Sequence, residues 1–425
     1  MRSPFILSLA AVATAFVIPH DDVFRRVSLE PRPSKAATQP EVDFDFLHSG
    51  VETALYEDYD NDSGAEGRPR HGHDHDPFNL TIYELISRSN HTKKFVELVN
   101  KHDNIVELLN STKANYTLFV PTDEAFEHVP DGAKPGKEFI DNLLKYHIGL
   151  GYYAGHKLRA THTIPTALNE DFLGGEAQRL RPRSGIFGTS VNFYSRVVAG
   201  NVGTRNGVVH AVNRLLAPPV MVGRELSLLP AQFSTLLLAY EKTHFVDFIH
   251  HVRMNGSTVF APDNGAFARL GPRANAFLFN TEKGLGYLRA LLKYQIVANA
   301  TLYSDAFYRE DSGGKEVGTE EREHFDLTTL LGDLPVAVDI VRFAGFTRMT
   351  VNGNVHVVVQ DAVAKNGVIQ VVNKLPIPPH KHHKGAWEQE EGEIEVDELK
   401  ERLEDYLEKD EKDEKDIHED WSEDL

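Results

Sequence analysis

Hydrophobic and polar residues follow two kinds of pattern along the chain, and the two kinds recur in the same order. Apolar residues three or four positions apart occur at 82–86, 95–99 and 105–109, and again at 233–240 and 245–252, which predicts amphipathic helices. Alternating or continuous apolar runs rich in β-branched residues predict strands at 158–164, 190–198, 208–212, 336–341, 349–351, 355–359 and 368–372. Helices therefore precede strands in both halves of the chain.

The stretch Tyr116–Pro130, YTLFVPTDEAFEHVP, predicts a corner of a hydrophobic core. Its β-branched and aromatic opening favours a strand, and Pro121 ends the strand because it has no N–H to donate. Thr122 and Asp123 are good helix N-cap residues, so we expect a helix to begin there with Ala125 and Phe126 turned inward. The same corner returns at 258–270, TVFAPDNGAFARL.

Two further blocks follow each corner in the same order. LLKYHI at 143–148 returns as LLKYQI at 291–296, and NGVVHAVNRLLAPP at 206–219 returns as NGVIQVVNKLPIPP at 366–379. In the last blocks, an Asn-Gly dipeptide predicts a tight turn before the final strand. The chain is therefore an internal duplication of a domain-sized unit, which is far longer than a solenoid repeat.

These three blocks, twice in order, resemble the two boxes and the central Tyr-His motif of the fasciclin-like (FAS1) domain. The resemblance implies an α+β fold of two consecutive FAS1 domains, 77–219 and 225–379, each a bent β-sheet region packed against a helical bundle. It also implies secreted or membrane-facing proteins that adhere or scaffold, without general enzymatic activity. The tandem arrangement is similar to two-domain proteins of fungi, which implies the vacuole lumen, with the cell exterior as the alternative.

Charge is concentrated at the C-terminus. The chain of 425 residues carries a formal net charge of −18. From Trp387 onward there are 20 acidic and 5 basic residues, which gives −15 and leaves about −3 for the rest. We expect an acidic tail over 380–425, which phosphates would repel, so a nucleic-acid partner is not expected. Val396, Leu399, Leu403 and Tyr406 form a short apolar stripe, which predicts a conditional helix and weak self-association through the tail as an alternative.

The N-terminus predicts entry into the secretory pathway. Residues 1–19 have the charge, apolar run and small residues of a signal peptide, and no later stretch predicts an integral membrane segment in the mature chain. The acidic C-terminus does not fit a GPI signal. Cysteine is absent from the sequence, which an oxidising compartment permits. N-glycosylation sequons begin at Asn61, Asn79, Asn90, Asn110, Asn115, Asn255 and Asn299.

Residues 20–76 predict a low-order linker or pro-region that ends in HGHDHD. His71, His73 and His75 alternate there, and three imidazoles could hold a borderline divalent ion such as zinc, copper or nickel. The other interpretation is a solvated polar linker without a metal. A second group, His380, His382 and His383, carries the same two interpretations.

Motifs for catalysis are absent from the sequence: it contains no Cys nucleophile, G-x-S-x-G elbow, Walker loop or H-E-x-x-H helix. We therefore expect no enzyme, no catalytic residue and no cofactor. The resemblance assigns a partner-binding role to Tyr146 and His147, with a protein or glycan as the partner, whereas the alternative is that both are buried and hydrogen-bonded internally. The second copy has Gln295 and Gln370 where the first has His147 and His210. The expected function is an adhesion, binding or scaffold module; the alternative is a lumenal metal-handling protein or enzyme that uses the His clusters.

Overall fold

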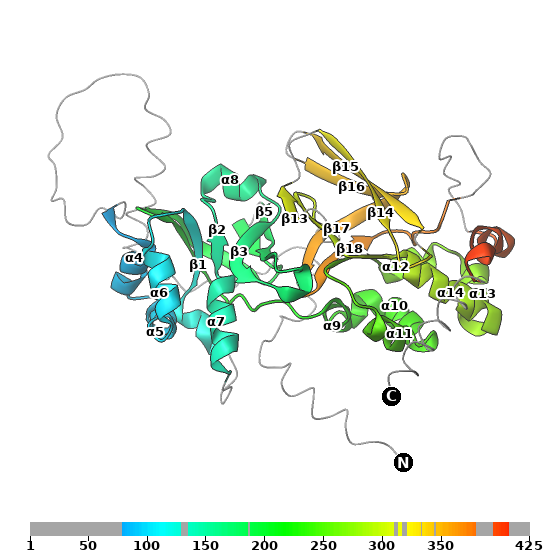
Figure 1. The fold of residues 1–425 in the computed structure, drawn as a ribbon, viewed down its shortest axis with the longest axis horizontal. Coiled ribbons are helices and arrows are strands. Elements are labelled where there is room, and N and C mark those ends of the chain that lie inside the picture. Colours follow the sequence, from blue (N-terminus) through cyan, green and yellow to red (C-terminus); the bar gives the residue numbers. More distant parts are fainter. Residues whose placement is uncertain are drawn as a thin grey trace, which may run out of the picture. The chain divides into compact units, whose positions relative to one another are not determined.

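The computed structural model describes residues 79–128, 135–185, 188–309, 313–316, 321–332, 334–343, 346–379 and 394–407. The chain divides into two compact units (Figure 1). The first comprises Met1–Leu168 and Ala177–Pro218, and the second comprises Asn169–Glu176 and Pro219–Leu425. The predicted signal peptide and the His71–His75 cluster lie outside the described residues.

The first unit begins with helices and continues with strands. Its helices are α4 (Ile82–Arg88), α5 (Lys93–Val99), α6 (Asp103–Asn110), η2 (Asp123–His128), α7 (Lys137–Tyr146) and α8 (Gly155–Ala160). Its strands are β1 (Tyr116–Pro121), β2 (Ile148–Leu150), β3 (Ile164–Asn169), β4 (Ala177–Leu180), β5 (Pro182–Gly185), β6 (Gly188–Val191), β7 (Ser195–Thr204) and β8 (Gly207–Val212). They form a sheet of order β4-β3-β2-β1-β8-β7-β6-β5. The corner strand β1 thus pairs in parallel with the last strand β8, and the Asn-Gly turn joins β8 to β7.

The second unit repeats this plan. Its helices are α9 (Val222–Ser227), α10 (Pro230–Lys242), α11 (Phe245–His251), α12 (Asn264–Ala268), α13 (Pro272–Asn280) and α14 (Glu282–Tyr294), and a 3-10 helix η3 (Asp171–Leu173) lies in its first segment. Its strands are β9 (Ser257–Pro262), β10 (Ile296–Ala298), β11 (Ala300–Leu302), β12 (Ala306–Arg309), β13 (Gly313–Glu316), β14 (Arg322–Thr328), β15 (Pro335–Phe343), β16 (Phe346–Val351), β17 (Val355–Ala364) and β18 (Gly367–Val372). One sheet has the order β10-β9-β18-β17-β16-β15-β14, and β11, β12 and β13 form another. The corner strand β9 again pairs in parallel with the last strand, β18. The α+β fold class expected from the sequence is confirmed.

The two corners have the predicted strand and stop, and the predicted cap is present in the second corner but not in the first. Asp263 caps its own helix α12, accepting from Ala266 N–H at 2.7 Å. Asp123 instead accepts from Lys94 N–H at 2.8 Å, at the start of the separate helix α5. The helix after Asp123 is a 3-10 helix, and Phe126 is half-buried rather than turned fully inward. Phe267, its counterpart, is 1% exposed.

Two predicted strands are wrong. The stretch 190–198 is not one strand, because a turn at residues 192–194 separates β6 from β7. Leu158, expected in a strand at 158–164, lies in helix α8, and the strand β3 begins only at Ile164. Leu158 is buried with Tyr146, Phe119 and Ile164 in one hydrophobic cluster. A single buried side chain on a short helix satisfies the same apolar pattern as a strand end, which explains the error.

The helix at residues 396–407 packs onto the second unit and is drawn in red beside α13 and α14 in Figure 1. Leu399 and Leu403 are 0% exposed. Lys400 Nζ lies 5.4 Å from the centre of the Phe277 ring of α13, and Lys283 of α14 pairs with Glu404 at 3.5 Å. The stripe predicted for a conditional tail helix is therefore occupied within the unit, and self-association through it would first require its release.

Candidate functional site

Tyr146 of the Tyr-His motif ties the end of α7 to the strands of the first unit. Its hydroxyl donates to Arg179 O at 3.0 Å and accepts from Asn192 Nδ2 at 2.7 Å. Asn192 adopts a φ of 49° between β6 and β7, and its Oδ1 accepts from Arg181 N–H at 2.9 Å. Asparagine tolerates this left-handed conformation because its short side chain can bond locally. Tyr146 is 0% exposed, so the phenol is a structural tie.

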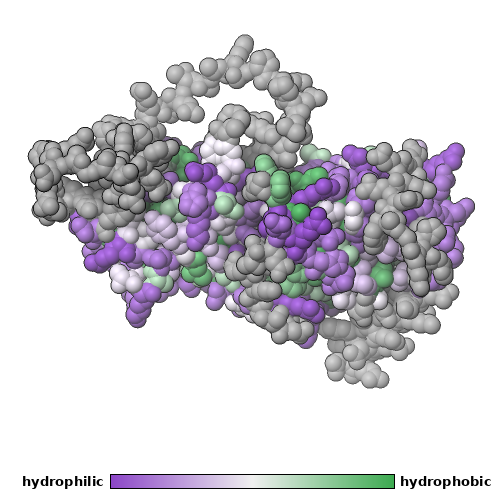
Figure 2. Space-filling model, turned by 90° about the horizontal axis from the view of Figure 1, so that it is seen from above, coloured by the Kyte–Doolittle hydropathy of each residue, from purple (hydrophilic) through white to green (hydrophobic). Residues whose placement is uncertain are grey.

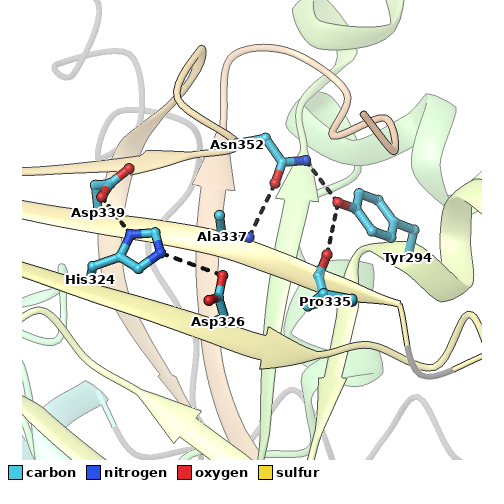
Figure 3. A network of polar contacts seen from close by, with 7 residues as sticks. All are labelled: Tyr294, His324, Asp326, Pro335, Ala337, Asp339 and Asn352. Atoms are coloured by element: carbon cyan, nitrogen blue, oxygen red, sulfur yellow. Dashed lines mark hydrogen bonds and ion pairs between the residues drawn. The ribbon is translucent and has the colours of Figure 1, made fainter. Parts of the chain in front are cut away.

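The second unit contains the same tie at equivalent residues (Figure 3). Tyr294 donates to Pro335 O at 3.3 Å and accepts from Asn352 Nδ2 at 2.9 Å. Asn352 also has a φ of 49°, and its Oδ1 accepts from Ala337 N–H at 3.2 Å. Burial raises the pKa of Tyr294 to about 12, so the phenol stays protonated and can donate. The duplication therefore preserves a hydrogen-bond network that the sequence analysis did not foresee.

His147, the second residue of the motif, is also 0% exposed. Its Nδ1–H donates to Leu143 O at 2.8 Å, and its Nε2 accepts from Leu216 N–H at 3.0 Å. Its ring centroid lies 5.4 Å from that of Phe95. Burial lowers the pKa of His147 to about 4, so the imidazole is neutral near pH 7.

His210 is held by the opposite tautomer. Its Nε2–H donates to Tyr153 O at 2.9 Å, and its Nδ1 accepts from Asn201 N–H at 3.2 Å. Its ring stacks on Phe119 with centroids 5.4 Å apart. Burial lowers the pKa of His210 to about 4 as well. Each histidine thus bridges one backbone acceptor and one backbone donor, which only a neutral imidazole can do.

Gln370 reproduces the His210 bridge in the second unit. Its Oε1 accepts from Asp361 N–H at 3.0 Å, and its Nε2 donates to Leu302 O at 3.0 Å. Glutamine therefore retains the hydrogen-bonding role of histidine at this position. This role does not extend to Gln295, because the buried Nε2 of Gln295 has no hydrogen-bond partner among the described residues.

Asp361 is a buried polar residue that the sequence analysis missed. It is 1% exposed and has a φ of 61°, as Asn201 has a φ of 63° in the first unit. Its carboxylate accepts from Ser304 N–H at 2.8 Å and from Ser304 Oγ at 2.5 Å. The available signal was a Gln-Asp pair that interrupts the apolar run of β17.

A family model of the fasciclin domain matches residues 90–218 and 231–378. The chain belongs to the fasciclin domain family. The resemblance seen in the three duplicated blocks is thereby confirmed. The buried Tyr, His, Asn and Gln side chains described above are part of the hydrogen-bonded cores of the two fasciclin units.

Relatives of this fasciclin protein include a fungal protein that aligns with most of the chain. This relative is the aurofusarin biosynthesis cluster protein S of Gibberella zeae, and the two sequences are 29% identical over 331 residues. The alignment covers 73% of this chain and 80% of that protein. The cell surface glycolipoprotein MPB83 of Mycobacterium bovis is 26% identical over 28% of this chain and 51% of its own length. The transforming growth factor-beta-induced protein ig-h3 of Sus scrofa is 27% identical over 33% of this chain and 19% of its own length.

The structure is also similar to a solved FAS1 domain pair from the insect cell adhesion molecule fasciclin I. The sequence identity is 18%, the TM-score is 0.31, and the match covers 67% of this chain and 95% of that one. The fasciclin relatives include a cell-surface protein, and the family match supports a fasciclin module of the non-enzymatic type.

A polar group lies on the open face of β14 and β15 in the second fasciclin unit (Figure 3). His324 Nδ1 lies 2.7 Å from Asp339 Oδ1, and His324 Nε2 lies 3.4 Å from Asp326 Oδ1. The hydrogen bond with Asp339 is the main reason that the pKa of His324 is raised. All three side chains are well exposed, so the group is an ion-pair cluster on the surface. The His-x-Asp spacing on one strand was its available sequence signal.

Within the described residues, no group of three or more His, Cys, Asp or Glu side chains could hold a metal ion. An open cavity of about 160 Å³ in the first unit is lined by Leu158, Arg159, residues 197–201 and His210, among others. Both ring nitrogens of His210 are already hydrogen-bonded, so the histidine offers no ligand there. No described helix has the length and apolar character needed to cross a membrane.

The sequons differ in accessibility. Exposed asparagines are Asn79, Asn90, Asn115 and Asn255. Asn110 and Asn299 are half-buried, and their Oδ1 atoms accept from Thr81 Oγ1 at 2.8 Å and from Asn255 N–H at 2.9 Å. Asn61 lies outside the described residues, and no sequon follows Asn299 in the sequence.

Proposed function

We propose that this fasciclin protein is a non-catalytic binding module of the secretory pathway that acts in adhesion or as a scaffold. The observation that carries the proposal is the exchange of histidine for glutamine between the two units. His210 and Gln370 make the same two backbone hydrogen bonds, one accepted and one donated. Glutamine does not titrate near neutral pH, so a function shared by both units does not use acid–base chemistry at this position.

A binding role for Tyr146 and His147 themselves is not part of the proposal. Both side chains are 0% exposed, and the polar atoms of both have internal partners. To contact a partner, these side chains would have to give up their internal hydrogen bonds. The buried backbone groups that they now satisfy would then be left without partners, which costs free energy. Surface residues are therefore better candidates for recognition than the motif.

The vacuole lumen is the proposed location, with the cell exterior as the alternative. The signal-like N-terminus and the sequons support entry into the secretory pathway. A cell-surface relative in the family agrees with this route. A tagged full chain imaged in its own cells, with endoglycosidase treatment of the purified protein, distinguishes passage through this pathway from retention outside it.

Saturable binding without turnover tests the proposed function. The labelled full chain is titrated onto isolated membrane and wall fractions of its own cells, with unlabelled chain as competitor. We expect saturable, competable binding that is unchanged in His210→Gln, which copies the second unit. Absence of saturable binding, or its loss in a His210→Gln protein that is still folded, would contradict the proposal.

A second candidate function follows from the fungal relative, whose alignment extends across both units and covers 80% of that protein. On this proposal the chain is an accessory component of a small-molecule biosynthetic pathway. Cells that lack the chain would then lose the product of that pathway, and the intact chain would restore it. An unchanged metabolite profile would exclude this candidate.

A further inference from the structure

We propose that the hairpin of β15 and β16 in the second unit inserts its tip into a lipid surface, an inference that rests on the proposed binding function and names its partner. Phe343 and Phe346 are a cross-strand pair at this tip and are 78% and 79% exposed. Both are more exposed than any other large hydrophobic side chain in the described part of the chain. Such exposure is costly in water and typical of an interaction site.

The tip is an extension specific to the second unit. The β15–β16 pairing runs from Val338↔Val351 to Phe343↔Phe346, whereas the equivalent β5–β6 pairing runs from Pro182↔Val191 to Gly185↔Gly188. The hairpin of the second unit thus continues past the level at which the hairpin of the first unit ends. In Figure 1, β15 and β16 lie on the side of the second unit away from α9–α11.

Behind the tip, the open face carries its charges in separate rows. Alternate residues of a strand share a face, so the row next to Phe343 contains Val341 with its neighbours Arg348 and Arg322. Arg348 contacts the imidazole of His356, and no described carboxylate pairs with Arg348 or Arg322. The following row contains Asp339 beside His324, as Figure 3 shows.

The spacing of these rows matches a bilayer interface. Same-face rows are two residues apart, or about 7 Å in an antiparallel strand. The headgroup region on each side of a bilayer is roughly 5–8 Å thick. Phenyl rings at the acyl boundary would place Arg322 and Arg348 at the phosphates and would leave Asp339 in water.

The small size of the apolar tip favours lipid over a folded partner. Two phenyl groups at this exposure offer roughly 250–400 Å² of apolar area, whereas a stable protein interface buries about 800 Å² on each side. On the face in Figure 2, described hydrophobic residues lie in small groups among hydrophilic ones. A fluid bilayer requires no complementary shape, so a small convex wedge is sufficient there.

Lipid charge should strengthen binding only modestly. Arg322 and Arg348 are offset by the exposed Glu321, which precedes β14, and the Arg342 guanidinium is already paired with Glu323. Among the described residues at this level, one positive charge thus remains in excess, and salt screens it within about 10 Å at 0.1 M. The absence of sequons after Asn299 also leaves this part of the chain without N-linked glycans.

Co-sedimentation of the full chain with vesicles tests the proposal. The vesicles contain phosphatidylcholine with or without phosphatidylserine. We expect binding to both, stronger with phosphatidylserine, and a loss of about tenfold or more in Phe343→Ser/Phe346→Ser. Arg322→Gln/Arg348→Gln should remove the preference for phosphatidylserine. The matched control is Val358→Ser, which alters an exposed apolar residue of β17 and should leave binding unchanged.

Two further measurements follow the tip. Tryptophan fluorescence reports its insertion into lipid, and light scattering of the lipid-free chain reports dimerisation. In a Phe346→Trp variant that also carries Trp387→Phe and Trp421→Phe, the tryptophan emission should shift to the blue when vesicles are added. Failure of the native chain to bind vesicles, or native-like binding by the double serine variant, would overturn the proposal. Phe-dependent dimerisation without lipid would show that the tip contacts a second copy instead. Continued saturable binding to native fractions in any of these cases would leave the proposed function standing.

Discussion

Acidification should destabilise the first unit selectively, because only that unit buries neutral histidines at the duplicated positions. His147 and His210 each accept a backbone N–H on one ring nitrogen and donate from the other. Protonation would place a new N–H against an existing N–H donor. The second unit has Gln295 and Gln370 at these positions and lacks this liability.

The sign and size follow from the difference in pKa between folded and unfolded chain. Both histidines fall from 6.5 to about 4 on folding. A lowered folded pKa means that the stabilisation is complete above pH 6.5 and is lost progressively as the pH falls towards 4. From pH 7 to pH 5 each histidine would cost about 2 kcal/mol of unfolding free energy, or about 4 kcal/mol for both. That is a large part of the 5–15 kcal/mol typical of a domain.

The second unit should respond in the opposite direction. Burial raises the pKa of Glu225 to about 7, despite the N–H of Val220 that its carboxylate accepts. A raised folded pKa gives stability that is present at low pH and is lost as the pH rises through 7. Acidification from pH 7 to pH 5 should therefore raise the contribution of Glu225 to the unfolding free energy of the second unit, while the unfolding free energy of the first unit falls.

Hydrogen exchange of the full chain at pH 7 and pH 5, corrected for intrinsic rates, measures both units in one sample. Peptides from β1, β8 and α7 should lose protection, and peptides from β9, β18 and α14 should not. His210→Gln should reduce the acid sensitivity of the first unit by about half. Equal loss of protection in both units, or full acid sensitivity in the His210→Gln variant, would refute the reasoning.

Other predictions concern packing, the tail and metal. Phe267→Ala should lower the unfolding free energy by about 3–5 kcal/mol in thermal melts. Phe126→Ala, at a half-buried site, should lower it by about 1–2 kcal/mol. Equal losses in the two variants would contradict the difference in burial. Removal of residues 408–425 should leave the melting temperature unchanged. Leu403→Ala should destabilise the second unit by about 2–5 kcal/mol, because Leu403 is fully buried. A lower melting temperature in the truncated chain, with no effect of Leu403→Ala, would rule out docking of the 396–407 helix. Zinc or nickel should leave the melting temperature unchanged if the His71–His75 segment is a linker, and a metal-dependent rise that vanishes in its triple alanine variant would favour the metal-handling alternative.

Local chemistry made the corners, the duplication and most helices predictable. Strand propensity and the missing N–H of Pro121 depend on adjacent residues, so the sequence contains the necessary information. Which helix a capping residue serves is not a local property. Asp123 accepts a hydrogen bond from Lys94 N–H, which is 29 positions away in the sequence. An amphipathic stripe likewise does not identify the surface that covers it, as residues 396–407 demonstrate.

The candidate sites were harder to predict than the fold. Burial of Tyr146 and His147 was one of two interpretations, but their partners are backbone groups brought close by the sheet. Backbone partners leave no residue-type signal in a sequence. Phe343 and Phe346 showed an apolar pair, yet a pattern alone does not distinguish a core residue from an exposed tip.

The central claim is that the polar residues of the duplicated motif hold the backbone and perform no chemistry. Imidazole nitrogen chemical shifts, measured by NMR on the labelled full chain from pH 7.5 downward, test it most directly. The account predicts an Nδ1–H tautomer for His147 and an Nε2–H tautomer for His210, both still neutral at pH 6. Titration of either ring near pH 6.5, or the opposite tautomer in either, would contradict the claim.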